Sequence, residues 1–114
     1  MAFEKEVQLL GDTVMYRFNP NLKKYALGDT GFVQNNAGAY VMQRALEPSK
    51  GLDQSIKLKI VINADVTGMK LKTINPSGNA TVNIFKNSDQ TELVELLRYY
   101  LNELVEREIL EVIV

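Results

Sequence analysis

Apolar and polar side chains alternate along most of the chain ahead of residue 87. The clearest run is residues 55–63, where Ile and Leu side chains occupy one side and two lysines the other. Residues 13–18, 69–72 and 80–85 show the same alternation. Because successive side chains of a β-strand point to opposite faces, this pattern predicts half-buried strands. The segments between the runs are rich in Gly, Asn and Pro, which favours turns.

Near residue 90 the pattern changes, and apolar residues recur every three or four positions. The stripe is formed by Leu93, Leu97, Tyr100, Leu101 and Leu104. This spacing is typical of an amphipathic helix that covers a core, and it predicts a helix from about Gln90 to Glu106. Glu95 is spaced for an ion pair with Arg98, and Glu103 for one with Arg107.

The end of the chain, residues 109–114, is too rich in β-branched side chains to extend that helix comfortably, so we expect a short terminal strand. Everything ahead of the helix is expected to form strands and turns. The fold class is therefore α+β, with antiparallel strands in two sheets, or one strongly bent sheet, packed on a single long C-terminal helix. The 114 residues suit one domain, 1–114, because no linker interrupts the pattern.

Glycines and asparagines gather between two of the expected strands. The simpler interpretation is a four-residue turn at 28–31 and a hairpin loop at 35–38, in which Asn36 and Gly38 adopt positive φ. The alternative is that both turns flank a cleft and offer Asn35 and Asn36 to a ligand, since loops often carry function.

Two arginines could serve the same cleft. Tyr40, Met42 and Arg44 share one face of the strand after the loop, and Arg17 lies on an earlier strand. An arginine beside a tyrosine on an inner face would bind a carboxylate or phosphate. The alternative places both arginines over an outer face, with their stems packed on it. The candidate ligand-binding residues are Arg17, Tyr40, Arg44, Asn35 and Asn36.

Lysines gather on the outer face of the expected hairpin of residues 56–62 and 68–74. They are Lys57, Lys59, Lys70 and Lys72. Like charges on neighbouring strands are destabilising unless solvent or a partner compensates them. They could protect the sheet from aggregation or bind an anion. The pI of about 5.4 and the lack of aromatic side chains on that face argue against a nucleic-acid partner.

Charge is divided unevenly along the chain. Residues 1–87 hold eleven Lys and Arg against seven Asp and Glu, whereas residues 88–114 hold two against seven. The basic body and the acidic helix can complement each other within one molecule. No apolar run approaches the roughly 18 residues of a membrane span, and the acidic start lacks the apolar core of a secretory signal. We therefore expect a cytoplasmic protein with no membrane partner.

The absence of histidine and cysteine removes whole classes of chemistry. Ser-His-Asp and Cys-His nucleophiles, common zinc sites, iron–sulfur ligation and thiol redox reactions all need those residues. The remaining carboxylates, lysines and tyrosines form no recognisable catalytic constellation, and glycine-rich phosphate-binding motifs are absent. The sequence leans towards a non-catalytic protein, with no catalytic residue, metal or cofactor assigned.

Two stretches carry a family resemblance, together with the length of the chain and its acidic helix. They are Gly-Asp-Thr-Val-Met-Tyr-Arg-Phe at 11–18 and Asn-Asn-Ala-Gly-Ala-Tyr at 35–40. On these features the chain resembles a small uncharacterised family from lactic-acid bacteria that is provisionally assigned to amino-acid metabolism. The resemblance implies an α+β fold with two sheets against one helix. That shape has been likened to bacterial S-adenosylmethionine decarboxylases, which implies a metabolic role.

The decarboxylase chemistry itself does not carry over to this chain. Those enzymes cleave themselves before a serine, usually at Glu-Ser, and use nearby His and Cys. Here the serines follow Pro48, Gln54, Pro76 and Asn87, and His and Cys are lacking. A shared shape could still supply a binding surface, because fold does not fix function.

Two hypotheses follow for function. The first is a non-catalytic or accessory protein of amino-acid metabolism that binds a small ligand, either amino-acid-like or anionic. The second is a protein-interaction or homodimer module without a small-molecule ligand. The apolar end, residues 112–114, and the separated charge support the second hypothesis.

Overall fold

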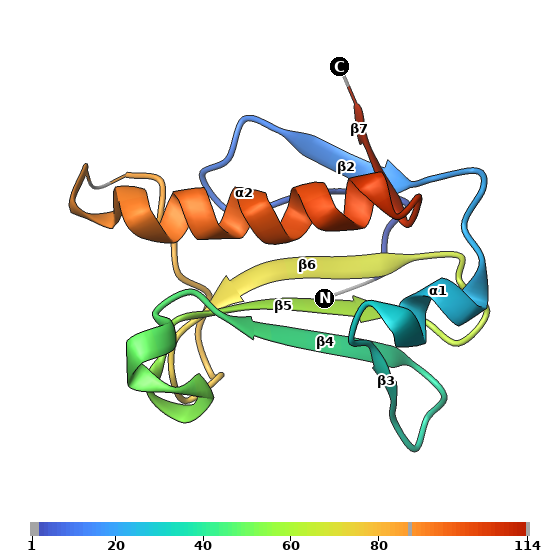
Figure 1. Ribbon diagram of the computed structural model, residues 1–114, viewed down its shortest axis with the longest axis horizontal. Helices are drawn as coiled ribbons and strands as arrows, with labels where there is room; N and C mark the ends of the chain where they lie inside the picture. The colour runs from blue at the N-terminus through green and yellow to red at the C-terminus, as the bar shows by residue number, and fades with distance from the viewer. Residues whose placement is uncertain (1–2, 87, 114) are drawn as a thin grey trace.

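A computed structural model describes residues 3–86 and 88–113 (Figure 1). It has the predicted α+β architecture, in which two antiparallel sheets pack on one long helix and the chain ends in a strand. The larger sheet has the order β3-β4-β5-β6, formed by Val33–Gln34, Tyr40–Ala45, Lys57–Ile62 and Met69–Ile74. The smaller sheet has the order β1-β2-β7, formed by Glu6–Gln8, Met15–Phe18 and Leu110–Ile113.

The two sheets are joined through the first residues of the chain. Glu4 pairs with Met69 of β6 through two backbone hydrogen bonds of 3.0 and 2.8 Å before the chain enters β1. Gly68 makes this approach possible, since a Cβ atom there would lie only 2.8 Å from the Cβ of Phe3. The two sheets therefore meet at the N-terminal segment, through the isolated bridge between Glu4 and Met69.

The long helix α2 (Thr91–Glu106) matches the predicted bounds closely and lies across the sheets (Figure 1). Its apolar stripe is buried at Leu97, Leu101 and Leu104, which belong to the same core cluster as the inward side chains of both sheets. From the larger sheet these are Met42, Leu58, Ile60, Ile62, Met69 and Leu71. Within the described residues, no helix combines the length and apolar character needed to cross a membrane.

A second, short helix was not predicted. Residues Lys24–Asp29 form α1, where strands and turns were expected, and Gly28 is part of this helix rather than the start of a turn. Ala26 and Leu27 bury their side chains in the core. Six residues are too few to show a helical period, because such a segment displays barely one repeat of the apolar face.

The strand expected at residues 80–85 is also wrong. This segment makes one isolated bridge, between Ile74 and Thr81, and then leaves the sheet. The hydroxyl of Thr73 donates to the carbonyl of Val82, and the Asn83 side chain accepts from the backbone N–H of Phe85 at 2.9 Å. Local side-chain bonds of this kind compete with a strand ladder, although Ile84 of this segment is still fully buried.

The hairpin of β3 and β4 is confirmed, but its loop is organised differently from the prediction. The side-chain oxygen of Asn35 accepts hydrogen bonds of 3.0 Å from the backbone N–H groups of Ala37 and Ala39. Gly38 has the expected positive φ of 87°, whereas Asn36 does not have one. Asn35 closes the loop with its side chain, so Asn36 need not enter the left-handed region.

Candidate functional site

Arg17 lies at the centre of a charged row on the outer face of the smaller sheet. The strand register places it opposite Glu6 of β1 on one side and Glu111 of β7 on the other. Its Nε donates to Glu111 Oε1 at 2.5 Å, and 49% of the Arg17 side chain is exposed. The ion pair uses Nε, so the two Nη nitrogens of the guanidinium are not part of it.

A cavity of about 420 Å³ adjoins this arginine. It lies where β1 begins, β2 ends and the β5–β6 turn approaches both. Its lining residues are Lys5, Glu6, Arg17, Phe18, Val66 and Thr67. Small-molecule sites usually measure about 300–1,000 Å³ and combine apolar walls with a few polar groups, as this cavity does.

The β5–β6 turn that closes the cavity is held by one asparagine. The Oδ1 of Asn63 accepts from the backbone N–H groups of Thr67 at 2.8 Å and Gly68 at 3.0 Å. Its Nδ2 donates to Thr67 Oγ1 at 2.9 Å. Val66 is thereby held at a φ of 57°, which is unfavourable for a β-branched side chain. Strained residues of this kind persist where the surrounding bonds fix them, often at functional sites.

The other predicted ligand residues lie elsewhere. Tyr40 and Arg44 share a face of β4 as expected, but β4 belongs to the larger sheet and Arg17 to the smaller one. Arg44 Nη2 donates to the carbonyl of Thr30 at 2.8 Å and fills the space beside Gly31. Arg44 therefore ties the end of α1 to β4. The structure does not bring the two arginines together into one receptor.

The two asparagines of the candidate set lie in the exposed loop between β3 and β4. The Asn35 side chain accepts its hydrogen bonds from Ala37 and Ala39, at the same hairpin loop, so it maintains the shape of that loop.

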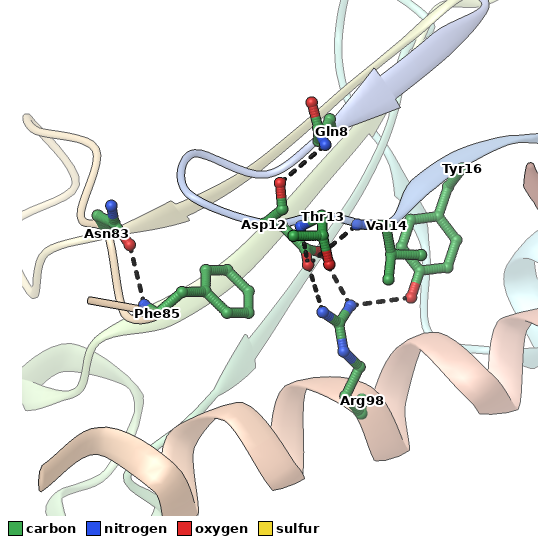
Figure 2. Close-up of polar contacts among 8 residues, drawn as sticks. All are labelled: Gln8, Asp12, Thr13, Val14, Tyr16, Asn83, Phe85 and Arg98. Atoms are coloured by element: carbon green, nitrogen blue, oxygen red, sulfur yellow. Dashed lines mark hydrogen bonds and ion pairs between the residues drawn. The ribbon is translucent and has the colours of Figure 1, made fainter. Parts of the chain in front are cut away.

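A polar cluster that the sequence pattern did not predict lies between α2 and the turn from β1 to β2 (Figure 2). Two guanidinium nitrogens of Arg98 bind the two carboxylate oxygens of Asp12, whose side chain is 1% exposed. Arg98 Nη1 also donates to the Tyr16 hydroxyl at 3.1 Å. Burial raises the pKa of Tyr16, against the opposing influence of Arg98, and the bonds to Asp12 raise the pKa of Arg98.

This cluster is better explained as a structural contact between α2 and the β1–β2 turn than as a reactive site. Asp12 Oδ1 also accepts from the backbone N–H groups of Thr13 at 2.7 Å and Val14 at 3.2 Å. Both carboxylate oxygens are thus occupied by partners within the protein. The expected pair between Glu95 and Arg98 is wrong, because Arg98 turns inward to Asp12.

The comparisons with known proteins decide the family. A family model described as "DUF1831: Putative amino acid metabolism" matches residues 1–111. The chain belongs to the DUF1831 family. It is similar to the crystal structure of a DUF1831 family protein from Lactobacillus plantarum, at 44% sequence identity, a TM-score of 0.90 and 99% coverage of each chain. The resemblance to a family of lactic-acid bacteria is thereby confirmed. Among curated proteins, no match is found.

This member of the DUF1831 family has a second cavity, of about 370 Å³, between α1 and the C-terminal end of α2. It is lined by Asn21, Lys23, Tyr25, Ala26, Arg107 and Glu108. Arg107 faces Asp29 of α1 at 3.6 Å instead of pairing with Glu103 as predicted. No group of three acidic side chains within the described part of the chain could hold a metal ion.

Proposed function

We propose that this protein binds a free amino acid in the cavity beside Arg17, as a non-catalytic or accessory component of amino-acid metabolism. The observation that carries the proposal is the set of charges around that cavity. Lys5 and Arg17 supply two cations, Glu6 supplies one carboxylate, and the wall between them is apolar. The family description supports the metabolic context.

The charges suit a zwitterion. The outer edge of the Arg17 guanidinium can bind a carboxylate in the two-pronged geometry that arginine favours, with Lys5 as a second cation. Glu6 is opposite Arg17 in the strand register and lines the cavity, so its carboxylate can accept from an ammonium group. A ligand with only one of the two charges would leave part of this site without a partner.

The apolar wall favours an amino acid with an apolar side chain. Phe18 and Val66 line the cavity while both also pack against the core, so their positions are well defined. The bonds of Asn63 fix the turn that carries Val66. A site held in place before binding loses less entropy when the ligand arrives.

A titration of the twenty amino acids, with polyamines and nucleotides for comparison, tests the proposal by thermal shift and calorimetry. A ligand present at 100 times its dissociation constant stabilises the fold by about 2.7 kcal/mol. We expect apolar amino acids to bind, and Arg17→Gln and Glu6→Gln to weaken binding at least tenfold.

The matched control is Glu103→Gln, which removes an exposed carboxylate of α2 that does not line this cavity. This variant should bind as the unmodified protein does. The proposal fails if no amino acid binds, or if Arg17→Gln binds with unchanged affinity.

A homodimer module is the second candidate function, and the exposed edge strand β7 supports it. Among the described strands β7 is an edge of its sheet, and Val112 on it is 40% exposed. An edge strand offers backbone hydrogen bonds to a second copy of the chain. Light scattering over a wide concentration range tests this directly, and a monomer at high concentration would count against it.

A further inference from the structure

The cavity between α1 and the end of α2 differs in chemistry from the one beside Arg17. One wall is the turn and helix that carry Asn21, Lys23 and Tyr25, and the other is formed by Arg107 and Glu108. The contact of Arg107 with Asp29 brings the C-terminal end of α2 to α1, so residues far apart in the sequence meet here. The cavity thus joins an aromatic ring, two cations and two hydrogen-bonding side chains.

Tyr25 exposes its ring to an unusual degree. It is 73% exposed, the most of any large apolar or aromatic side chain in the described residues. The next residue, Ala26, is buried in the core and fixes the backbone of α1 beneath it. An exposed aromatic ring on a fixed backbone is a stacking platform for a planar ligand.

Lys23 and Arg107 place positive charge on two sides of the same cavity. The contact of Arg107 with Asp29 is long, at 3.6 Å, and joins side chains that are 47% and 58% exposed. Exposed pairs of this kind hold their partners weakly, so a stronger anion can displace Asp29. Lys23 precedes α1 without capping it through its side chain. Arg and Lys together bind phosphate well, the arginine through two parallel hydrogen bonds and the lysine as a point charge.

Glu108 occupies a position where glycine is usual. The backbone N–H groups of Ile109 and Glu108 bond to the carbonyls of Leu104 and Val105 at 3.0 and 3.1 Å, which is the Schellman ending of a helix. Glu108 has a φ of 60° at the left-handed position of this motif. The strain costs stability, yet it directs a carboxylate to Asn21, whose Nδ2 donates to Oε2 at 2.9 Å.

The pair of Glu108 and Asn21 presents acceptor oxygens next to the stacking ring. Carboxylate and amide oxygens of this kind accept from the exocyclic amino groups of adenine or cytosine. The negative charge of Glu108 also opposes a ligand with several anionic groups. The cavity therefore favours one phosphate over a di- or triphosphate.

We propose that this second cavity binds a nucleoside monophosphate with an amino-bearing base. The base lies on Tyr25 with its amino group towards Glu108, and the phosphate lies between Lys23 and Arg107. This site is separate from the one assigned to an amino acid and does not depend on it.

The probes are adenosine monophosphate, adenosine, uridine monophosphate and inorganic phosphate, titrated at constant ionic strength by calorimetry and ligand-observed NMR. We expect adenosine monophosphate to bind at least tenfold more tightly than each of the other three probes. Tyr25→Ala and Lys23→Gln should each weaken its binding about tenfold. Both side chains are exposed, so the fold should tolerate their loss.

Two matched controls separate this site from general surface effects. Tyr99→Ala removes another exposed tyrosine, 64% exposed on α2, and Lys24→Gln removes the lysine next to Lys23. Neither residue lines the cavity, so both variants should bind as the unmodified protein does. Equal affinity for inorganic phosphate alone, no detectable binding of adenosine monophosphate, or equal losses in the controls would each overturn the proposal. The amino-acid titration would be unaffected by any of these results.

Discussion

Arg98 in α2 binds the buried carboxylate of Asp12 through two guanidinium nitrogens, across 86 positions of sequence (Figure 2). Only 1% of the Asp12 side chain and 28% of the Arg98 side chain are exposed. The pair fixes the helix to the turn between β1 and β2. Two elements that are distant in sequence are thereby set in one orientation.

Removing the arginine should be severely destabilising. Arg98→Met leaves a buried carboxylate with no cation, which costs about 3–5 kcal/mol in other proteins. Denaturant titration measures the loss in the free energy of unfolding. Arg107→Met is the matched control, because its exposed contact with Asp29 should contribute less than about 1 kcal/mol. Equal small losses in both variants would show that the buried pair contributes no more than a surface contact.

The same cluster predicts a change of stability at alkaline pH. Burial raises the pKa of Tyr16 above its usual value of 10.0, so the folded state retains this proton longer than the unfolded state does. The stability contributed by the neutral hydroxyl is complete below about pH 10 and is lost as the pH rises through the folded-state pKa.

Tyr16→Phe isolates this effect. At neutral pH it should lower the free energy of unfolding by about 0.5–1.5 kcal/mol, because the hydrogen bond from Arg98 is lost. Above pH 10 the difference between the two proteins should shrink, since phenylalanine has no proton to lose. Denaturant titrations from pH 8 to 11 measure it, and a difference that stays constant would contradict the assignment.

The sequence predicts the fold well where the pattern is long. The stripe of α2 and the alternation of the β5–β6 hairpin extend over enough residues to define their period, and both elements form as expected. Lys59 and Lys72 face each other directly across that hairpin, on the shared face that the alternation predicts. Lys57 lies on the same face but is only 8% exposed. A sequence pattern assigns a side chain to a face of the sheet but does not show what covers that side chain.

Long-range partners could not be predicted in the same way. Spacing along a helix suggested Glu95 for Arg98. A buried carboxylate without a cation is far more costly than an exposed one, and only the fold brings Asp12 near Arg98. The long-range neighbours in the candidate site beside Arg17 could not be predicted either. Arg17 was identified from its residue type and strand, whereas Val66 and Lys5 join it only because the sheets meet at the N-terminal segment.

The helix is expected to be held by its apolar side and not by its charge. Leu97 is 0% exposed, so Leu97→Ala should cost about 2–5 kcal/mol. Glu103 is exposed on the opposite side, and Glu103→Gln should cost less than about 1 kcal/mol. Denaturant titration of both variants measures the loss in the free energy of unfolding and shows whether the apolar side or the charge holds the helix. A larger loss for the glutamine variant would indicate that the acidic face binds a cation or a basic partner.

Two glycines test whether the join between the sheets is as tight as the structure indicates. A methyl group at Gly68 would lie 2.8 Å from the Cβ of Phe3 and 3.3 Å from the backbone nitrogen of Glu4, whereas at Gly28 no heavy atom lies within 4 Å. Gly68→Ala must displace the N-terminal segment and should cost about 1–3 kcal/mol. Gly28→Ala, within α1, should instead stabilise the protein by about 0.5–1 kcal/mol.

The same two glycine variants should also differ in ligand binding. Gly68 directly follows Thr67 in the wall of the cavity, so Gly68→Ala should weaken amino-acid binding as well as stability. Gly28→Ala should leave the affinity unchanged, because α1 does not line that cavity. Calorimetric titration of both variants with the amino acid that binds the unmodified protein makes the comparison. Unchanged affinity in a destabilised Gly68→Ala would mean that the N-terminal segment can move without disturbing Lys5 and Glu6, and the ligand would then have to bind elsewhere.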